Sequence, residues 1–146
     1  EEAFQTLIIS RPLIEYNQDS SDRIQADRLL RSLGQKPVLH TSVSTSYLVV
    51  GLVSEIDGWC LIPPINLWAA GLNCHDVDFY PIPGRSLKRT YWLAHKQIRN
   101  QALFQLVRDK TKKVLAENFL VSMERELPGI SKFIHISESN KKGFDQ

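Results

Sequence analysis

The sequence predicts an α/β fold built on an open, mostly parallel sheet. Short apolar runs of strand length alternate with segments of helical periodicity, the links between them are short, and glycine or proline stands where several elements should end. A strand, helix, strand, helix, strand order indicates right-handed crossovers within one parallel sheet. With 146 residues, 42% of them hydrophobic, the chain is long enough to bury one core.

The first strand–helix unit lies near the start of the chain. Residues 1–7 suit one or two helical turns, and the apolar run 12–16 is typical of a buried strand. Polar residues 19–21 offer N-cap oxygens for a following helix, which Gly34 should end. The apolar residues of that helix recur at i, i+3, i+4 and i+7: Ala26, Leu29, Leu30 and Leu33.

A second unit repeats this order. Residues 37–41 are expected to form a strand and residues 44–46 the cap of the next helix. A short link at 57–58 then leads to a strand at 59–62, which is apolar on both faces and ends before two prolines. The apolar stripe of the helix consists of Val49, Leu52, Val53 and Ile56.

The remainder of the chain predicts two extended segments and a long helix. A weak helical turn at 67–70 is followed by a strand at 77–82 and an extended run at 89–94. From about Asn100 the spacing indicates a helix that Pro128 and Gly129 must stop. Residues 131–146 end in a polar stretch that we expect to be mostly disordered.

Composition excludes several classes of protein. The 18 Lys and Arg against 16 Asp and Glu give a net charge of only +2, which is not the basic excess of a free-standing nucleic-acid binder. No apolar run approaches the roughly 20 residues that span a bilayer, so no membrane contact is expected. Cys60 and Cys74 are too few for a disulfide-stapled secreted module, and no signal peptide precedes the first strand. We therefore expect a cytoplasmic protein.

The sequence offers no catalytic or metal-binding constellation. Cys74 and His75 stand beside Asp76 and Asp78, but no second pair at ligand spacing accompanies them, so we expect no metal. No nucleophile, base and orienting group occur at a credible spacing. We expect no catalytic residues, no cofactor and no enzymatic activity.

Four segments have a characteristic order ahead of the long C-terminal helix. They are 11–16 (RPLIEY), 44–53, 58–63 (GWCLIP) and 88–94 (KRTYWLA). Their succession resembles the C-terminal part of the effector-binding domain of LysR-type transcriptional regulators, over about residues 7–118. The family often carries a Gly-x-Gly link before its third segment. Here Ile56 stands at the first glycine position, which predicts a longer or reshaped helix end.

The resemblance implies a fold of the periplasmic-binding-protein-like type. Residues 1–127 would be part of an effector-binding domain: about 8–86 the ligand-binding lobe, and about 87–127 the returning strand and closing helix of the other lobe. Residues 128–146 would be a flexible tail. The rest of the other lobe and the winged helix-turn-helix that contacts DNA are expected outside this chain. The family likeness also implies a homo-oligomer, either dimer or tetramer.

An open parallel lobe binds small molecules at the carboxyl ends of its strands, where helix N-termini favour anions. The matching stretches are 16–21, 40–46 and 63–66. Ser44 and Thr45 are the strongest ligand-binding candidates, because their hydroxyls can donate to a ligand while the following amides cap it; the alternative is that they only cap their own helix. The further ligand-binding candidates are Asn17 and Ser20, where capping is the competing interpretation, and Pro63, where strand termination is.

These observations favour a ligand-sensing regulatory domain of a LysR-type DNA-binding regulator. A small polar or anionic effector would bind between the two lobes and change their closure. The alternative is a solute-binding protein of the periplasmic type, whose lobes share this architecture. A helix-turn-helix encoded upstream would support the first hypothesis and a secretion signal the second.

Overall fold

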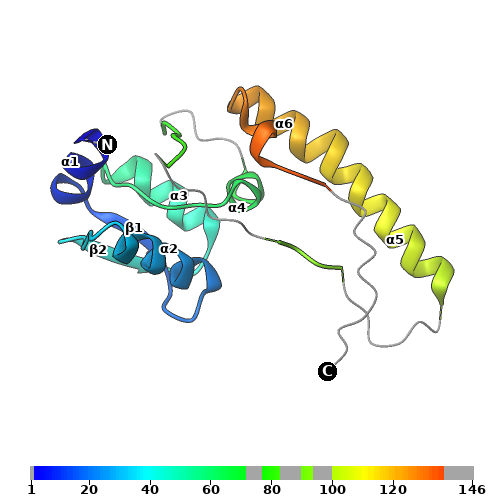
Figure 1. Cartoon of the computed structure of the whole chain (residues 1–146), viewed down its shortest axis with the longest axis horizontal. Helices are drawn as coiled ribbons and strands as arrows, with labels where there is room; N and C mark the ends of the chain where they lie inside the picture. Colours follow the sequence, from blue (N-terminus) through cyan, green and yellow to red (C-terminus); the bar gives the residue numbers. More distant parts are fainter. Residues whose placement is uncertain (1, 72–76, 83–89, 94–99, 137–146) are drawn as a thin grey trace. The chain divides into compact units, whose positions relative to one another are not determined.

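The computed structural model describes residues 2–71, 77–82, 90–93 and 100–136. Residues Glu1–Thr90 form one compact unit and Tyr91–Gln146 form another. The first unit contains α1 (Glu2–Ser10), β1 (Leu13–Tyr16), α2 (Ser21–Ser32), β2 (His40–Val43), α3 (Ser46–Glu55) and α4 (Pro64–Ala69), as Figure 1 shows.

Strand β1 is the centre of a small parallel sheet. It pairs in parallel with β2, with Leu13 opposite His40 and Tyr16 opposite Val43. On its other edge, Leu13 forms a parallel bridge with Trp59, and the Ile14 N–H donates to the Trp59 carbonyl at 2.8 Å. The predicted parallel pairing with helical crossovers is therefore present among the described residues, in a sheet of two strands and one further bridge.

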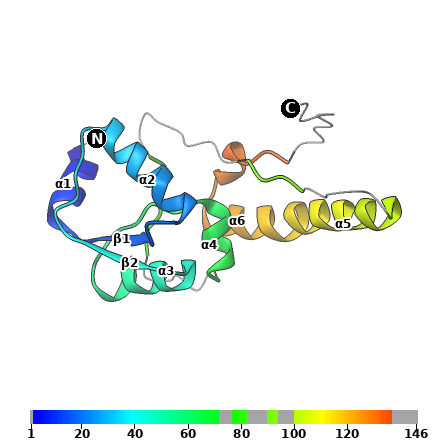
Figure 2. The same cartoon turned by 90° about the horizontal axis from the view of Figure 1, so that it is seen from below.

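The side chains of β1 alternate between two apolar clusters. One face of the strand packs Leu13 with Ile8 of α1, Leu30 of α2 and Trp59. The other face packs Ile14 and Tyr16 with Val49 and Val53, both from α3. This alternation follows from the two-residue period of a strand, and it places the strands between α2 and α3 (Figure 2).

The ends of α2 and the cap of α3 agree with the sequence prediction, whereas α4 begins at Pro64 rather than at 67, and Ile56, expected in the apolar stripe of α3, follows the helix and is 44% exposed. Ser20 caps α2 by accepting a hydrogen bond from the Asp22 N–H, and Thr45 caps α3 by accepting from the Leu48 N–H. Gly34 follows α2 with a φ of 67°, a left-handed conformation that glycine adopts without strain. Beyond α3 the same conformation falls on Asp57, with a φ of 52°, in the link before Gly58.

Several predicted strands are shifted or missing. The second strand begins at His40 rather than at residue 37, and Val38 and Leu39 are 72% and 59% exposed. The apolar composition of Val38 and Leu39 suits a strand, but the hydrogen bonds to β1 begin only at the Leu39 carbonyl.

The later extended segments do not join the sheet. Residues 59–62 contribute a single bridge at Trp59 instead of a strand. Residues 77–82 form neither strand nor helix, so the strand expected there is not found. Of the extended run expected at 89–94, residues 90–93 pair with no strand among the described residues, and 89 and 94 lie outside them. An apolar alternating run needs a partner edge to become a strand, and Pro81 lacks the N–H that such an edge requires.

The second unit is mainly one long helical segment, as predicted from Asn100 onward. Helix α5 (Gln101–Val114) continues through a π-helical turn (Leu115–Phe119) into α6 (Leu120–Glu126), and a 3₁₀ turn follows at Ile130–Phe133. The Asn100 side chain caps α5 by accepting from the Leu103 N–H at 3.0 Å. In the described part of the chain, none of the helices is both long and apolar enough to cross a membrane.

The stop predicted at Pro128 and Gly129 is confirmed, because α6 ends at Glu126 and a short 3₁₀ turn follows. Gly129 has a φ of 90°, and the Glu124 carboxylate accepts hydrogen bonds from the N–H groups of Gly129 at 2.7 Å and Ser131 at 3.0 Å. These hydrogen bonds lower the pKa of the Glu124 carboxyl. Residues 130–133 thus form a 3₁₀ turn after the stop, and the polar stretch expected to be mostly disordered falls at 137–146, outside the described residues.

Candidate functional site

A hydrogen-bonded cluster of polar side chains lies at the carboxyl end of β1. The Tyr16 hydroxyl is 2.9 Å from the Ser46 hydroxyl, and the Asn66 side-chain N–H₂ donates both to the Tyr16 hydroxyl at 3.2 Å and to the Asp22 carboxylate at 2.8 Å. We call Tyr16, Ser46, Asn66 and Asp22 the Tyr16 cluster. Its members come from strand β1 and from the helices α2, α3 and α4.

Local structure explains why these side chains meet. Tyr16 is the last residue of β1, whereas Ser46 is the first residue of α3. Asp22 is in the first turn of α2, where a carboxylate is favoured by the helix dipole. Asn66 is in α4, whose start is fixed by Pro63 at the N-cap and by a second proline at the first helical position. Each side chain therefore lies where an element begins or ends.

The structure brings the five predicted ligand-binding residues to this same edge. Ser44 and Thr45 lie between β2 and α3 and are exposed. Asn17 follows β1 and is also exposed, and its backbone N–H donates to the Val43 carbonyl at 3.1 Å. Ser20 and Pro63 are half-buried at the starts of α2 and α4. The capping role expected as the alternative is present for Ser20 and Thr45.

The polar side chains that join these loops were not chosen from the sequence. Tyr16 and Asn66 are at the limits of two stretches expected to form the site, but neither side chain is among the predicted ligand-binding residues, and Tyr16 is predicted only as part of a buried strand. Ser46 was counted only as a cap residue. Tyr16 is only 6% exposed, so its hydroxyl contacts Ser46 from inside the fold. The side chains exposed to solvent at this edge include those of Ser44, Thr45 and Asn17.

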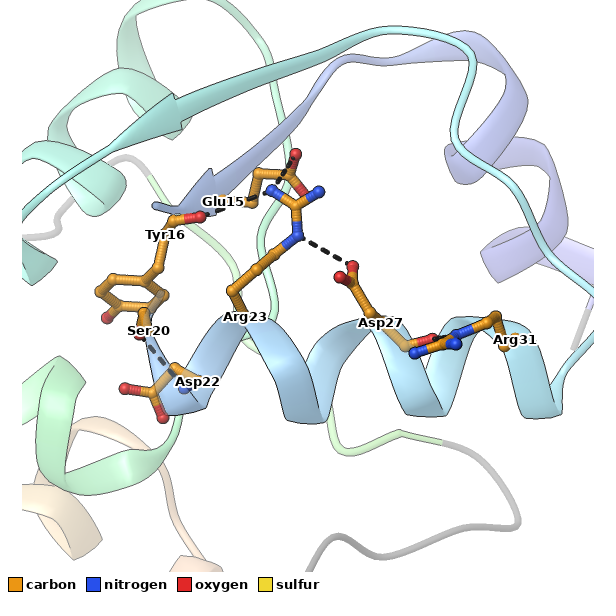
Figure 3. A network of polar contacts seen from close by, with 7 residues as sticks. All are labelled: Glu15, Tyr16, Ser20, Asp22, Arg23, Asp27 and Arg31. Carbon is orange, nitrogen blue, oxygen red and sulfur yellow. Dashed lines mark hydrogen bonds and ion pairs between the residues drawn. The ribbon is translucent and has the colours of Figure 1, made fainter. Parts of the chain in front are cut away.

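A second polar group lies on the opposite face of β1. Arg23 of α2 forms ion pairs with Glu15 of β1 at 2.5 Å and with Asp27 one turn along α2 at 2.9 Å. Its guanidinium also donates to the Tyr16 carbonyl at 3.4 Å. Figure 3 shows Arg23 reaching from α2 to the strand between the two carboxylates. We call Glu15, Arg23 and Asp27 the Arg23 ion-pair group.

Glu15 is the buried carboxylate of this group. It is 6% exposed, and burial raises the pKa of its carboxyl above the ordinary value, while the charges of Arg23 and His40 act in the opposite direction. A charge buried in this way is tolerated because Arg23 is directly beside it. The group therefore fixes α2 against β1 at a position close to the Tyr16 cluster.

The chemistry of the edge is that of hydrogen bonding. Hydroxyl, amide and backbone N–H groups can orient a small polar molecule, and helix starts favour negative charge on it. In the part of the chain that is described, no group of three or more His, Cys, Asp or Glu side chains is placed to hold a metal ion. Cys60 is half-buried next to the apolar cluster beneath α3.

Comparison with known proteins gives one match. A family model described as the LysR substrate binding domain matches residues 8–116, well over half of the chain. No curated protein and no solved structure matches the chain.

Proposed function

The chain belongs to the LysR substrate-binding domain family, and from that premise we propose that it is the ligand-sensing domain of a LysR-type transcriptional regulator. Domains of this family serve regulation rather than catalysis. The effector would be a small polar or anionic molecule held between two lobes, of which residues 8–86 supply one. Residues 87–127 would belong to the other lobe, with 128–146 as an appended tail.

The observation that carries this proposal is the convergence of exposed polar loops at one edge of the sheet. Ser44, Thr45 and Asn17 present hydroxyl and amide groups to solvent there. Behind them, the Tyr16 cluster links α2, α3 and α4 by hydrogen bonds. An effector that touches the loops would thus find them already oriented, which reduces the entropy that binding has to overcome.

The regulatory output would follow from lobe closure. An effector that binds one closure state better than another shifts the population toward that state. In the intact regulator this shift would change how the subunits of a dimer or tetramer present helix-turn-helix domains to DNA in the cytoplasm. DNA binding and oligomerisation are thus part of what we propose for the intact regulator.

A thermal-shift screen of small polar metabolites tests the proposal. A ligand that binds only the folded state stabilises it by RT ln(1 + [L]/Kd), about 2.7 kcal/mol at a hundredfold excess over Kd. We expect an effector found in this way to stabilise the Ser44→Ala protein less than the wild type. Ser54→Ala, an exposed serine on α3 away from the edge, is the matched control and should respond like the wild type.

The outcome that contradicts the site assignment is equal stabilisation of all three proteins. The outcome that contradicts the regulatory function is an intact protein whose DNA binding does not change when a confirmed ligand is added. Both measurements use the same effector, so the site and the output are tested separately.

A further inference from the structure

Arg23 connects strand β1 with helix α2 through two of its guanidinium nitrogens, Nε and Nη1. Its side chain is 15% exposed, and it contacts the Glu15 carboxylate, the Asp27 carboxylate and the Tyr16 carbonyl. Two of these contacts are on neighbouring residues of β1, and the third is on α2 itself. An arginine held by a buried carboxylate and a strand carbonyl has little freedom to move, so it fixes the distance between the first turns of α2 and the end of the strand.

The residue before Arg23 reaches the Tyr16 cluster. Asp22 accepts from the Asn66 side chain at 2.8 Å, and the same Asn66 amide group donates to the Tyr16 hydroxyl. Adjacent residues on a helix point in different directions, and here one side chain of the pair contacts Glu15 while the other contacts Asn66. Any movement of this turn relative to β1 would therefore change both sets of contacts together.

We propose that Arg23 is a positioning residue for the ligand site: by holding the first turns of α2 against Glu15 and the Tyr16 carbonyl, it sets the placement of Asp22, Asn66 and the Tyr16 hydroxyl behind the effector loops. The inference rests on the proposed function only in treating this edge of the sheet as a ligand site. The contacts that connect Arg23 with the Tyr16 cluster lie within this chain and are present without an effector.

Protonation of Glu15 is a natural perturbation of this link. The charged groups that act on Glu15 are Arg23 and Asp27 from α2 and His40 from β2. When Glu15 gains a proton it loses its charge, so its attraction to the Arg23 guanidinium weakens and Arg23 is left with Asp27 and the Tyr16 carbonyl. The Tyr16 hydroxyl should report this change although it is on the other face of the strand.

The experiment is carbon NMR of the full chain labelled with ¹³C in its tyrosine rings. The sequence has only 4 tyrosines, so the Tyr16 signal can be assigned from its loss in Tyr16→Phe. We expect Arg23→Gln to shift the Tyr16 signal in the same direction as Asn66→Ala does. Arg28→Gln, the same substitution at an exposed position of the same helix, should leave the signal in place. A folded Arg23→Gln protein with an unshifted Tyr16 signal would overturn the proposal.

A pH titration of the wild type decides the question without substituting Arg23. Burial raises the pKa of Glu15, so as pH falls from neutrality the carboxyl gains its proton before an exposed glutamate does. The Tyr16 signal should move as this happens, and in Glu15→Gln the movement should be lost. Glu55→Gln, an exposed glutamate on α3, should keep it. A wild-type Tyr16 signal that does not move with pH would contradict the connection between Glu15 and Tyr16. A Tyr16 signal that moves equally in Glu15→Gln would contradict it as well. Because no effector is added, these results are independent of whether the proposed function is correct.

Discussion

Gly58 should not tolerate a methyl group, although glycine is not needed there for its backbone conformation. Its φ lies outside the left-handed region, but a Cβ built on it would be 3.0 Å from the Pro12 carbonyl oxygen and 3.1 Å from Cγ1 of Ile14. The side chain of Ile14 can adjust, whereas the Pro12 carbonyl is held because it accepts the Trp59 N–H at 3.0 Å. Gly58→Ala must therefore push Trp59 away from β1.

The size of the effect follows from overpacking. An extra methyl group forced into a packed site costs about 1–3 kcal/mol. Gly51 is the matched control, because it is in the exposed part of α3 and nothing lies within 4 Å of its Cβ position. There Gly→Ala should stabilise the protein by about 0.8–1.0 kcal/mol through helix propensity alone. The same substitution at two positions should thus have opposite signs.

The assay is urea unfolding followed by tryptophan fluorescence in a Trp92→Phe background, so that the signal comes from Trp59 and Trp68 of the first unit. The urea concentration at the unfolding midpoint should be highest for Gly51→Ala, intermediate for the wild type and lowest for Gly58→Ala. The two variants should differ by about 2–4 kcal/mol in free energy of unfolding. A Gly58→Ala protein as stable as the wild type would refute the close approach of the 57–58 link to β1.

Two further substitutions test the cluster and the C-terminal turn. Asn66→Ala removes the donor shared by the Tyr16 hydroxyl and the Asp22 carboxylate, so it should lower the free energy of unfolding by about 1–3 kcal/mol, measured by the same urea assay. Glu124 has a lowered pKa in the folded chain, so the stability it contributes is present above its unfolded-state pKa and is lost as pH falls through the lower folded value. The Gly129 and Ser131 amides should therefore be protected from hydrogen exchange, and this protection should fall on acidification. Protection should be reduced in Glu124→Gln and retained in the control Glu117→Gln. Equal protection in the wild type and both variants would argue against hydrogen bonding of these amides to the Glu124 carboxylate.

Local signals in the sequence are sufficient to predict helices α2 and α3. The cap at Ser20, the stop at Gly34 and the apolar spacing between them define α2 without reference to the rest of the molecule. The same holds for α3, where Thr45 caps the helix and Val49 and Val53 are buried. Capping and helical periodicity depend on neighbours within one or two turns, which is why the sequence alone reveals them.

Strands could be predicted less well because their pairing depends on residues far along the chain. Nothing near Val38 and Leu39 indicates that pairing with β1 begins only beside them, or that 77–82 finds no partner among the described residues. In the candidate site, too, the local features could be predicted and the long-range contacts could not. The loops with Ser44, Thr45 and Asn17 were found from local chemistry, whereas the meeting of Tyr16 with Asn66 depends on how α4 returns to the end of β1.

The two polar groups on β1 are a consequence of one strand register. Glu15 and Tyr16 are adjacent, so their side chains must lie on opposite faces: Glu15 toward Arg23 of α2, and Tyr16 toward Ser46 of α3. A slip of one residue would put the Glu15 carboxylate into the apolar cluster beneath α3 and leave Arg23 without its buried partner. The ion pair therefore penalises the register that would destroy the Tyr16 cluster, and the same short strand specifies both the fold and the candidate site.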